Sequence, residues 1–131
     1  MCLDVCDLLP GTKTGQNLEY QLSKSSTSPA LVYGEAQAAE SKADSIHKMK
    51  VVLKEIRESR VNLRMIIEKP VIVNEKVQIA FKEANEFMAI FLKSIETANQ
   101  NKISSTFSKG VLRTNSLFLF LISFVFSLQV K

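Results

Sequence analysis

Residues 45–67 read SIHKMKVVLKEIRESRVNLRMII, and apolar side chains recur through them at alternating steps of three and four residues. This is the a/d heptad pattern of a helix that packs against near-parallel neighbours. Ser41 or Asp44 can cap the start of the helix, and Pro70 stops it just after its end. The series consists of Ile46, Met49, Leu53, Ile56, Arg60 as its one polar member, Leu63 and Ile67.

A second helix is predicted from about Asn74 to Ala98. Asn74 is a suitable N-cap, and Glu75 lies in the first turn, where a negative charge is favourable. The link between the two helices, residues 68–71, is short enough to make them antiparallel neighbours. The apolar series of the second helix is Val77, Ala80, Ala84, Phe87 and Phe91.

The upstream part of the chain, residues 14–40, has the same helical spacing. Pro29 falls inside it, so we expect this helix to be kinked or interrupted near Ser28. A short helical stub over 3–9 precedes it and ends at Pro10. Only 4 Gly and 3 Pro occur in 131 residues, and no long segment has a strand period. The sequence therefore predicts an all-α, up-down antiparallel bundle.

Composition divides the chain into three parts. We predict a helical bundle domain over 1–102, a Ser/Thr-rich linker over 103–115 and an apolar segment over 116–131. Residues 1–102 hold 14 of the 17 basic residues and all 13 acidic ones, so their net charge is +1 of the total +4. The bundle itself is therefore close to neutral.

The apolar segment allows three interpretations. As a membrane anchor, residues 117–130 fall short of the roughly 17–25 residues that a spanning helix needs. As a bundle element, they could pack on the other helices. As a non-native extension, an uncharged run rich in Phe would be a site of aggregation.

Residues 33–50, YGEAQAAESKADSIHKMK, and residues 53–59, LKEIRES, resemble the four-helix bundle protein family whose founding members are encoded by intervening sequences in bacterial 23S ribosomal RNA genes. Residues 21–30 look like that family's kinked second helix, and 81–98 like its fourth. The likeness covers about 3–102. The first helix of the family is a full bundle helix, whereas here it is mostly missing, and the apolar segment has no counterpart.

The resemblance implies a bundle of four helices without enzymatic activity. Because an incomplete first helix exposes apolar surface, we expect the chain to form a homo-oligomer, or residues 116–130 to fold back into the gap. Related bundle proteins are basic, ring-forming accessory subunits of retroelement reverse transcriptases, which implies RNA or DNA as a possible partner.

Few residues have side chains suited to catalysis or to metal binding. Cys2 and Cys6 are more simply explained as small buried side chains than as metal ligands, since His47 is the only other soft donor. His47 itself has no visible nucleophile to activate. We therefore predict no catalytic, cofactor or metal site. With an acid in place of the bases of a secretory signal, the amino terminus predicts a cytoplasmic protein.

The one candidate site is a basic face on the helix over 45–67. Its members step by four, three and seven residues, so they share one helical face that could follow a phosphate backbone. The alternatives are a solvated face on a scaffold or protein-partner adaptor without affinity for nucleic acid, and a bundle tethered to a membrane. The candidate nucleic-acid-binding residues are Lys50, Lys54, Arg57 and Arg64.

Overall fold

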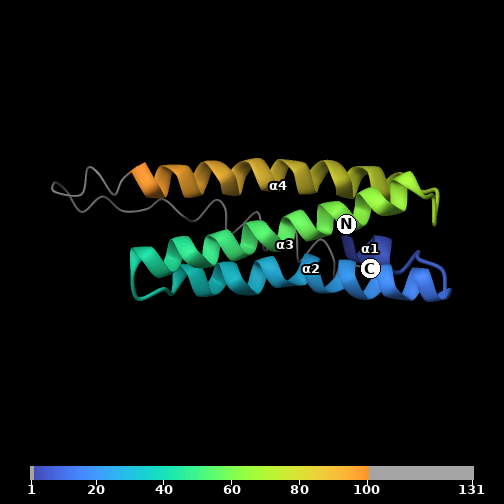
Figure 1. Ribbon diagram of the computed structural model, residues 1–131, viewed down its shortest axis with the longest axis horizontal. Helices are drawn as coiled ribbons and strands as arrows, with labels where there is room; N and C mark the ends of the chain where they lie inside the picture. The colour runs from blue at the N-terminus through green and yellow to red at the C-terminus, as the bar shows by residue number, and fades with distance from the viewer. Residues whose placement is uncertain (1, 101–131) are drawn as a thin grey trace.

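The computed structural model describes residues 2–100, and every regular element in that range is an α-helix (Figure 1). The predicted all-α bundle is therefore confirmed. The predicted linker over 103–115 and apolar segment over 116–131 lie outside the described residues. The four helices are α1 (Cys2–Cys6), α2 (Lys13–Gln37), α3 (Lys42–Glu68) and α4 (Glu75–Gln100).

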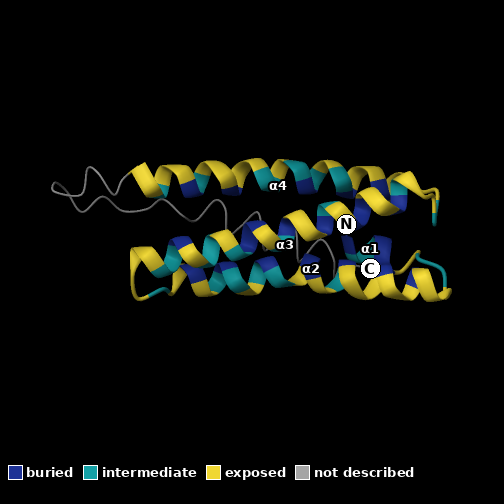
Figure 2. Cartoon of the chain, viewed as in Figure 1, coloured by how far each residue is buried: buried dark blue, intermediate teal, exposed yellow. Residues whose placement is uncertain are grey.

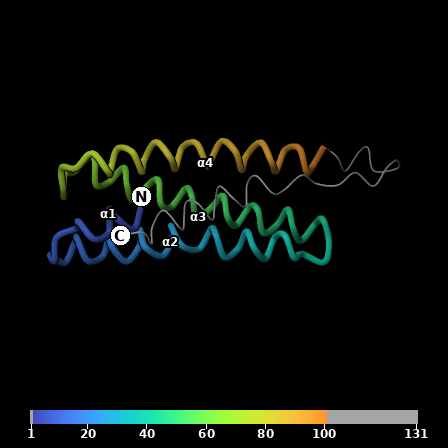
Figure 3. The backbone as a smooth tube through the Cα atoms, turned by 180° about the vertical axis from the view of Figure 1, so that it is seen from behind, coloured from blue at the N-terminus to red at the C-terminus, as the bar shows by residue number. Residues whose placement is uncertain are grey.

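Three long helices form two antiparallel hairpins that share α3. α3 packs against α2 along one side and against α4 along another, whereas the backbones of α2 and α4 are not close neighbours. The short α1 packs on both α2 and α4 at the end of the bundle where α2 begins (Figures 1 and 3). The fourth helical position is thus filled by α1 over part of the bundle length, as expected from the short stub.

Side-chain caps fix where the long helices begin. The Ser41 hydroxyl accepts a hydrogen bond from the backbone N–H of Asp44 at 3.1 Å, so Ser41 is the N-cap of α3. The Thr12 hydroxyl does the same for α2, and the side-chain oxygen of Asn74 accepts from the N–H of Lys76 at 2.9 Å at the start of α4. These bonds satisfy N–H groups that would otherwise have no partner.

The buried side chains form two clusters, and buried positions recur along all three long helices (Figure 2). At the α1 end, Leu22, Leu63 and Ile66 are completely buried together with residues of α1. At the other end, the rings of Tyr33 on α2 and Phe91 on α4 meet edge to face, with centroids 5.7 Å apart. This aromatic contact spans from α2 to α4 where α1 does not reach.

The predicted apolar series of α3 is correct in part. Met49 and Ile67 are only half-buried, while Val52 and Ile66, one position away from the heptad series, are completely buried. The difference arises because α3 packs against two long helices at once. Contact on two sides needs an apolar stripe wider than the a/d seam of a two-helix contact.

We predicted a kink or an interruption near Ser28; α2 runs through Pro29 as one continuous helix, so it is not interrupted there. Pro29 has no N–H to donate to the preceding turn, but it is buried and lines the same small cavity as Ile56 of α3 and Phe87 of α4. Packing on α3 and α4 therefore holds the chain helical against the local preference. The hydroxyls of Ser25, Ser26 and Thr27 bond carbonyls three or four residues back in the adjacent turn.

Two glycines of α2 form a matched pair for a stability test. A Cβ at Gly15 would lie 1.9 Å from the carbonyl oxygen of Pro10, whereas a Cβ at Gly34 would meet nothing within 4 Å. We expect Gly15→Ala to lower the free energy of unfolding by about 2 kcal/mol or more, because the backbone of the α1–α2 turn must shift. Gly34→Ala is expected to raise it by up to about 1 kcal/mol through helix propensity. Urea unfolding followed by circular dichroism measures both. Equal effects of the two substitutions would contradict the close approach of Pro10 to α2.

Candidate nucleic-acid interface

The four predicted basic residues all lie on the exposed side of α3. Lys50, Lys54, Arg57 and Arg64 are solvent-exposed, and none of them contributes to either buried cluster. From the first to the last is 14 residues, which at 1.5 Å per residue is about 21 Å along the helix axis. The structure thus brings the predicted side chains together on one face, which we call the α3 basic face.

Two of these four cationic side chains form ion pairs with glutamates on the same helix. Lys54 Nζ lies 3.0 Å from Glu58 Oε1, and Arg64 Nε lies 2.6 Å from Glu68 Oε1, each pair one helical turn apart. The hydrogen bond from Lys54 to Glu58 raises the pKa of that lysine, so the lysine stays protonated at neutral pH. Within residues 2–100, Lys50 and Arg57 take part in no ion pair.

The α3 basic face also carries apolar side chains. Val61 is 51% exposed and Met65 is 45% exposed, and both lie on α3 close to Arg57 and Arg64. Position-by-position sequence reasoning missed them because they fall outside the apolar series. Their signal was present, because Val61 lies one helical turn after Arg57 and Met65 lies one turn after Val61. The surface is therefore mixed rather than purely cationic.

Arg60 has a structural place between α3 and α4. Its Nε donates to Asn85 Oδ1 at 2.6 Å, its guanidinium lies 5.5 Å from the centroid of the Phe81 ring, and Asn85 Nδ2 donates to the Phe81 carbonyl. A cation over an aromatic ring is attracted to its negative face. Arg60 thus occupies a heptad position that is usually apolar, and its contacts connect α3 to α4. It does not belong to the α3 basic face.

Both cysteines are free and buried, as predicted. Burial raises the pKa of Cys2 to about 11 and that of Cys6 to about 12. The carboxylates of Glu83 and Asp4 raise the pKa of Cys2 further. A nucleophilic or metal-binding cysteine needs an environment that stabilises the thiolate, and this one favours the thiol. Among residues 2–100, no group of three or more His, Cys, Asp or Glu side chains is placed to hold a metal ion.

His47 is exposed on α3, and the nearby Asp44 carboxylate forms an ion pair with Lys48 at 3.0 Å. The carboxylate that could orient His47 thus has a different partner. As for the membrane, none of the helices within 2–100 has the length and apolarity to span one.

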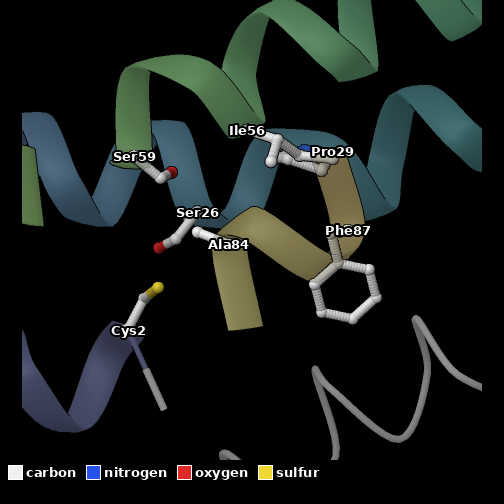
Figure 4. A pocket seen from close by; sticks show the side chains of 7 residues that line it. All are labelled: Cys2, Ser26, Pro29, Ile56, Ser59, Ala84 and Phe87. Atoms are coloured by element: carbon white, nitrogen blue, oxygen red, sulfur yellow. The ribbon is translucent and has the colours of Figure 1, made fainter. Parts of the chain in front are cut away.

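A small cavity of about 20 Å³ lies where α1 begins (Figure 4). Figure 4 shows the Cys2 side chain pointing toward Ser26 of α2 and Ala84 of α4. A space of this size holds about one water molecule, whereas pockets for small organic ligands measure roughly 300–1,000 Å³. The lining residues are Cys2, Ser26, Pro29, Ile56, Ser59, Ala84 and Phe87.

The buried Cys2 thiol predicts a pH dependence of stability. Folding keeps this thiol protonated up to about pH 11, whereas its usual pKa is 9.0. The free energy of unfolding contributed by Cys2 is therefore constant below pH 9 and falls between pH 9 and 11, by up to about 1.4 kcal/mol per pH unit. Urea unfolding from pH 8 to 10.5 should show a steeper fall for the native chain than for Cys2→Ala. Parallel curves for the two proteins would show that Cys2 ionises as readily in the folded state.

No protein-family model, curated protein or solved structure matches this chain. The resemblance to the family encoded in 23S ribosomal RNA intervening sequences therefore stays a prediction, and the all-α bundle rests on the structure itself.

Proposed function

We propose that this protein is a non-enzymatic binding module that contacts the phosphate backbone of a nucleic acid through the α3 basic face. The observation that carries the proposal is the row of four exposed cations along about 21 Å of one rigid helix. Phosphate contacts by Lys and Arg supply most of the sequence-independent affinity of nucleic-acid-binding proteins. A helix that holds these cations in a fixed row limits the entropy lost on binding.

The ion pairs on the face are compatible with this function. Exposed pairs one helical turn apart contribute little to stability, because water and salt screen them. A phosphate can therefore displace Glu58 from Lys54 or Glu68 from Arg64 at small cost. At Lys50 and Arg57 a phosphate has no glutamate to displace, so we expect these two residues to bind phosphate more strongly.

The absence of catalysis is part of the proposal. It is supported by two buried cysteines whose surroundings favour the thiol over the thiolate. The sequence resemblance to bundle proteins without enzymatic activity supports the same interpretation, and it is the basis for the expected RNA or DNA partner.

A second candidate function is protein binding, including self-association. The observation that favours it is the exposure of Val61 and Met65 beside the arginines of the α3 basic face. Protein interfaces commonly combine Met and Arg, whereas a phosphate backbone offers no apolar surface to Val61. In this alternative the protein is a homo-oligomer or an adaptor, and its partner covers the same face of α3.

Two matched double variants test the proposal. Lys50→Gln with Arg57→Gln removes two cations from the α3 basic face, while Lys82→Gln with Lys93→Gln removes two exposed cations from α4. We expect the first to weaken the binding of labelled RNA and duplex DNA about tenfold and to lower the slope of log affinity against log salt by about 2. The α4 variant should lower that slope less. Fluorescence anisotropy between 50 and 300 mM salt measures both.

The competing function gives different results. Equal losses in the two variants would mean that α3 has no special role, and no binding by the native chain would contradict the proposal outright. In that case sedimentation of the native chain and of Val61→Asp tests the second candidate, which predicts an oligomer that the substitution disrupts.

A further inference from the structure

The short helix α1 carries both cysteines of the chain, and both are buried. Cys2 is 3% exposed and Cys6 is 6% exposed, and Val5 between them is completely buried. The Cys6 thiol donates to the backbone carbonyl of Glu19 on α2, with 3.7 Å between sulfur and oxygen. The Cys2 side chain points toward Ala84 of α4 (Figure 4). Both sulfur atoms thus face the neighbouring helices.

α1 depends on this packing for its helical structure. It has five residues, whereas an isolated helix shorter than about 12–15 residues is marginal in water. On α4, Glu83 Oε2 is buried without a hydrogen-bond partner among residues 2–100. Burial raises the pKa of Glu83, and the carboxylates of Glu86 and of Asp4 on α1 raise it further. Because a buried acceptor without a partner opposes packing, we expect α1 to detach more easily than the long helices unfold.

A disulfide between Cys2 and Cys6 does not fit an α-helix. Side chains four residues apart in a helix have Cβ atoms about 5–6 Å apart, whereas a disulfide needs about 3.5–4.5 Å. The bond would also remove the S–H that Cys6 donates to Glu19. The two sulfur atoms can therefore join only when the backbone between them leaves its helical geometry, which takes Val5 out of the core.

We propose that Cys2 and Cys6 form a redox switch, in which the two thiols allow α1 to pack on the bundle and a disulfide between them holds α1 unwound and away from α2 and α4. The oxidant is a small-molecule disulfide such as oxidised glutathione. One cysteine thiolate attacks the oxidant and expels one thiolate, and the other cysteine then attacks the mixed disulfide and expels the second. The two cysteines lose two protons and two electrons, and one oxidised glutathione becomes two thiols.

Packing of α1 protects the thiols from this reaction. Burial raises the pKa of Cys2 to about 11 and that of Cys6 to about 12, so the reactive thiolate is scarce while α1 is packed. Release into water returns both thiols toward their ordinary pKa of 9.0. Oxidation then keeps α1 away from the apolar side chains of α2 and α4 that share its buried cluster, among them Leu18, Leu22 and Ala80.

Oxidation of the full chain tests this switch. Oxidised glutathione should produce a disulfide within one chain, which mass spectrometry detects as the loss of two hydrogens from the monomer. The amides of Asp7 and Leu8, which donate to carbonyls of α1, should then exchange their hydrogens at least tenfold faster. The α3 amides of 52–66 should stay protected, and dithiothreitol should restore slow exchange. Cys2→Ala with Cys6→Ala should exchange at one rate with and without the oxidant.

Three results would overturn the proposal. The first is that excess oxidised glutathione produces no Cys2–Cys6 disulfide, and the second is that it joins only cysteines of different chains. The third is a Cys2–Cys6 disulfide that leaves the exchange of Asp7 and Leu8 slow. None of these measurements involves the α3 basic face, so the switch and the proposed function fail separately.

The rate of oxidation provides a second measurement with a matched control. Val5 of α1 and Val52 of α3 are both completely buried, but they lie in different clusters. Val5→Ala should speed the formation of the disulfide at least fivefold, because it weakens the packing of α1. Val52→Ala should change the rate less than twofold. Equal acceleration by the two substitutions would show that the thiols react only after complete unfolding, which contradicts a switch confined to α1.

Discussion

The two-sided burial of α3 is the constraint from which the rest of the structure follows. α2 and α4 each pack on α3 and are not close neighbours of one another. Val52, Leu63 and Ile66 are completely buried at this shared contact. At about 1.5–3 kcal/mol for each buried aliphatic side chain, these contacts outweigh local preferences, including that of Pro29 to end a helix.

The same constraint determines what α3 can offer a partner. With two sides of the helix buried, only one arc faces water, and the sequence places Lys50, Lys54, Arg57 and Arg64 on it. The α3 basic face thus lies on the side of this central helix that neither α2 nor α4 covers.

Much of the fold could be predicted because it depends on local signals. The heptad period, the cap at Ser41 and the exposed basic face all follow from the order of residues in one helix. The contacts of Arg60 with Asn85 and of Tyr33 with Phe91 could not be predicted, since each depends on the relative rotation of two helices. The continuity of α2 through Pro29 could not be predicted for the same reason, because it depends on how α2 packs on the other helices.

Native-state hydrogen exchange measures most directly whether α3 holds the bundle together. If it does, the amides of Val52 to Ile66 exchange only through complete unfolding, and their opening free energy equals that from urea unfolding. The amides of α1 and the first turn of α2 should open at lower free energy. Exchange of the α3 amides through a smaller opening, while those of α2 or α4 remain protected, would contradict the central role of this helix.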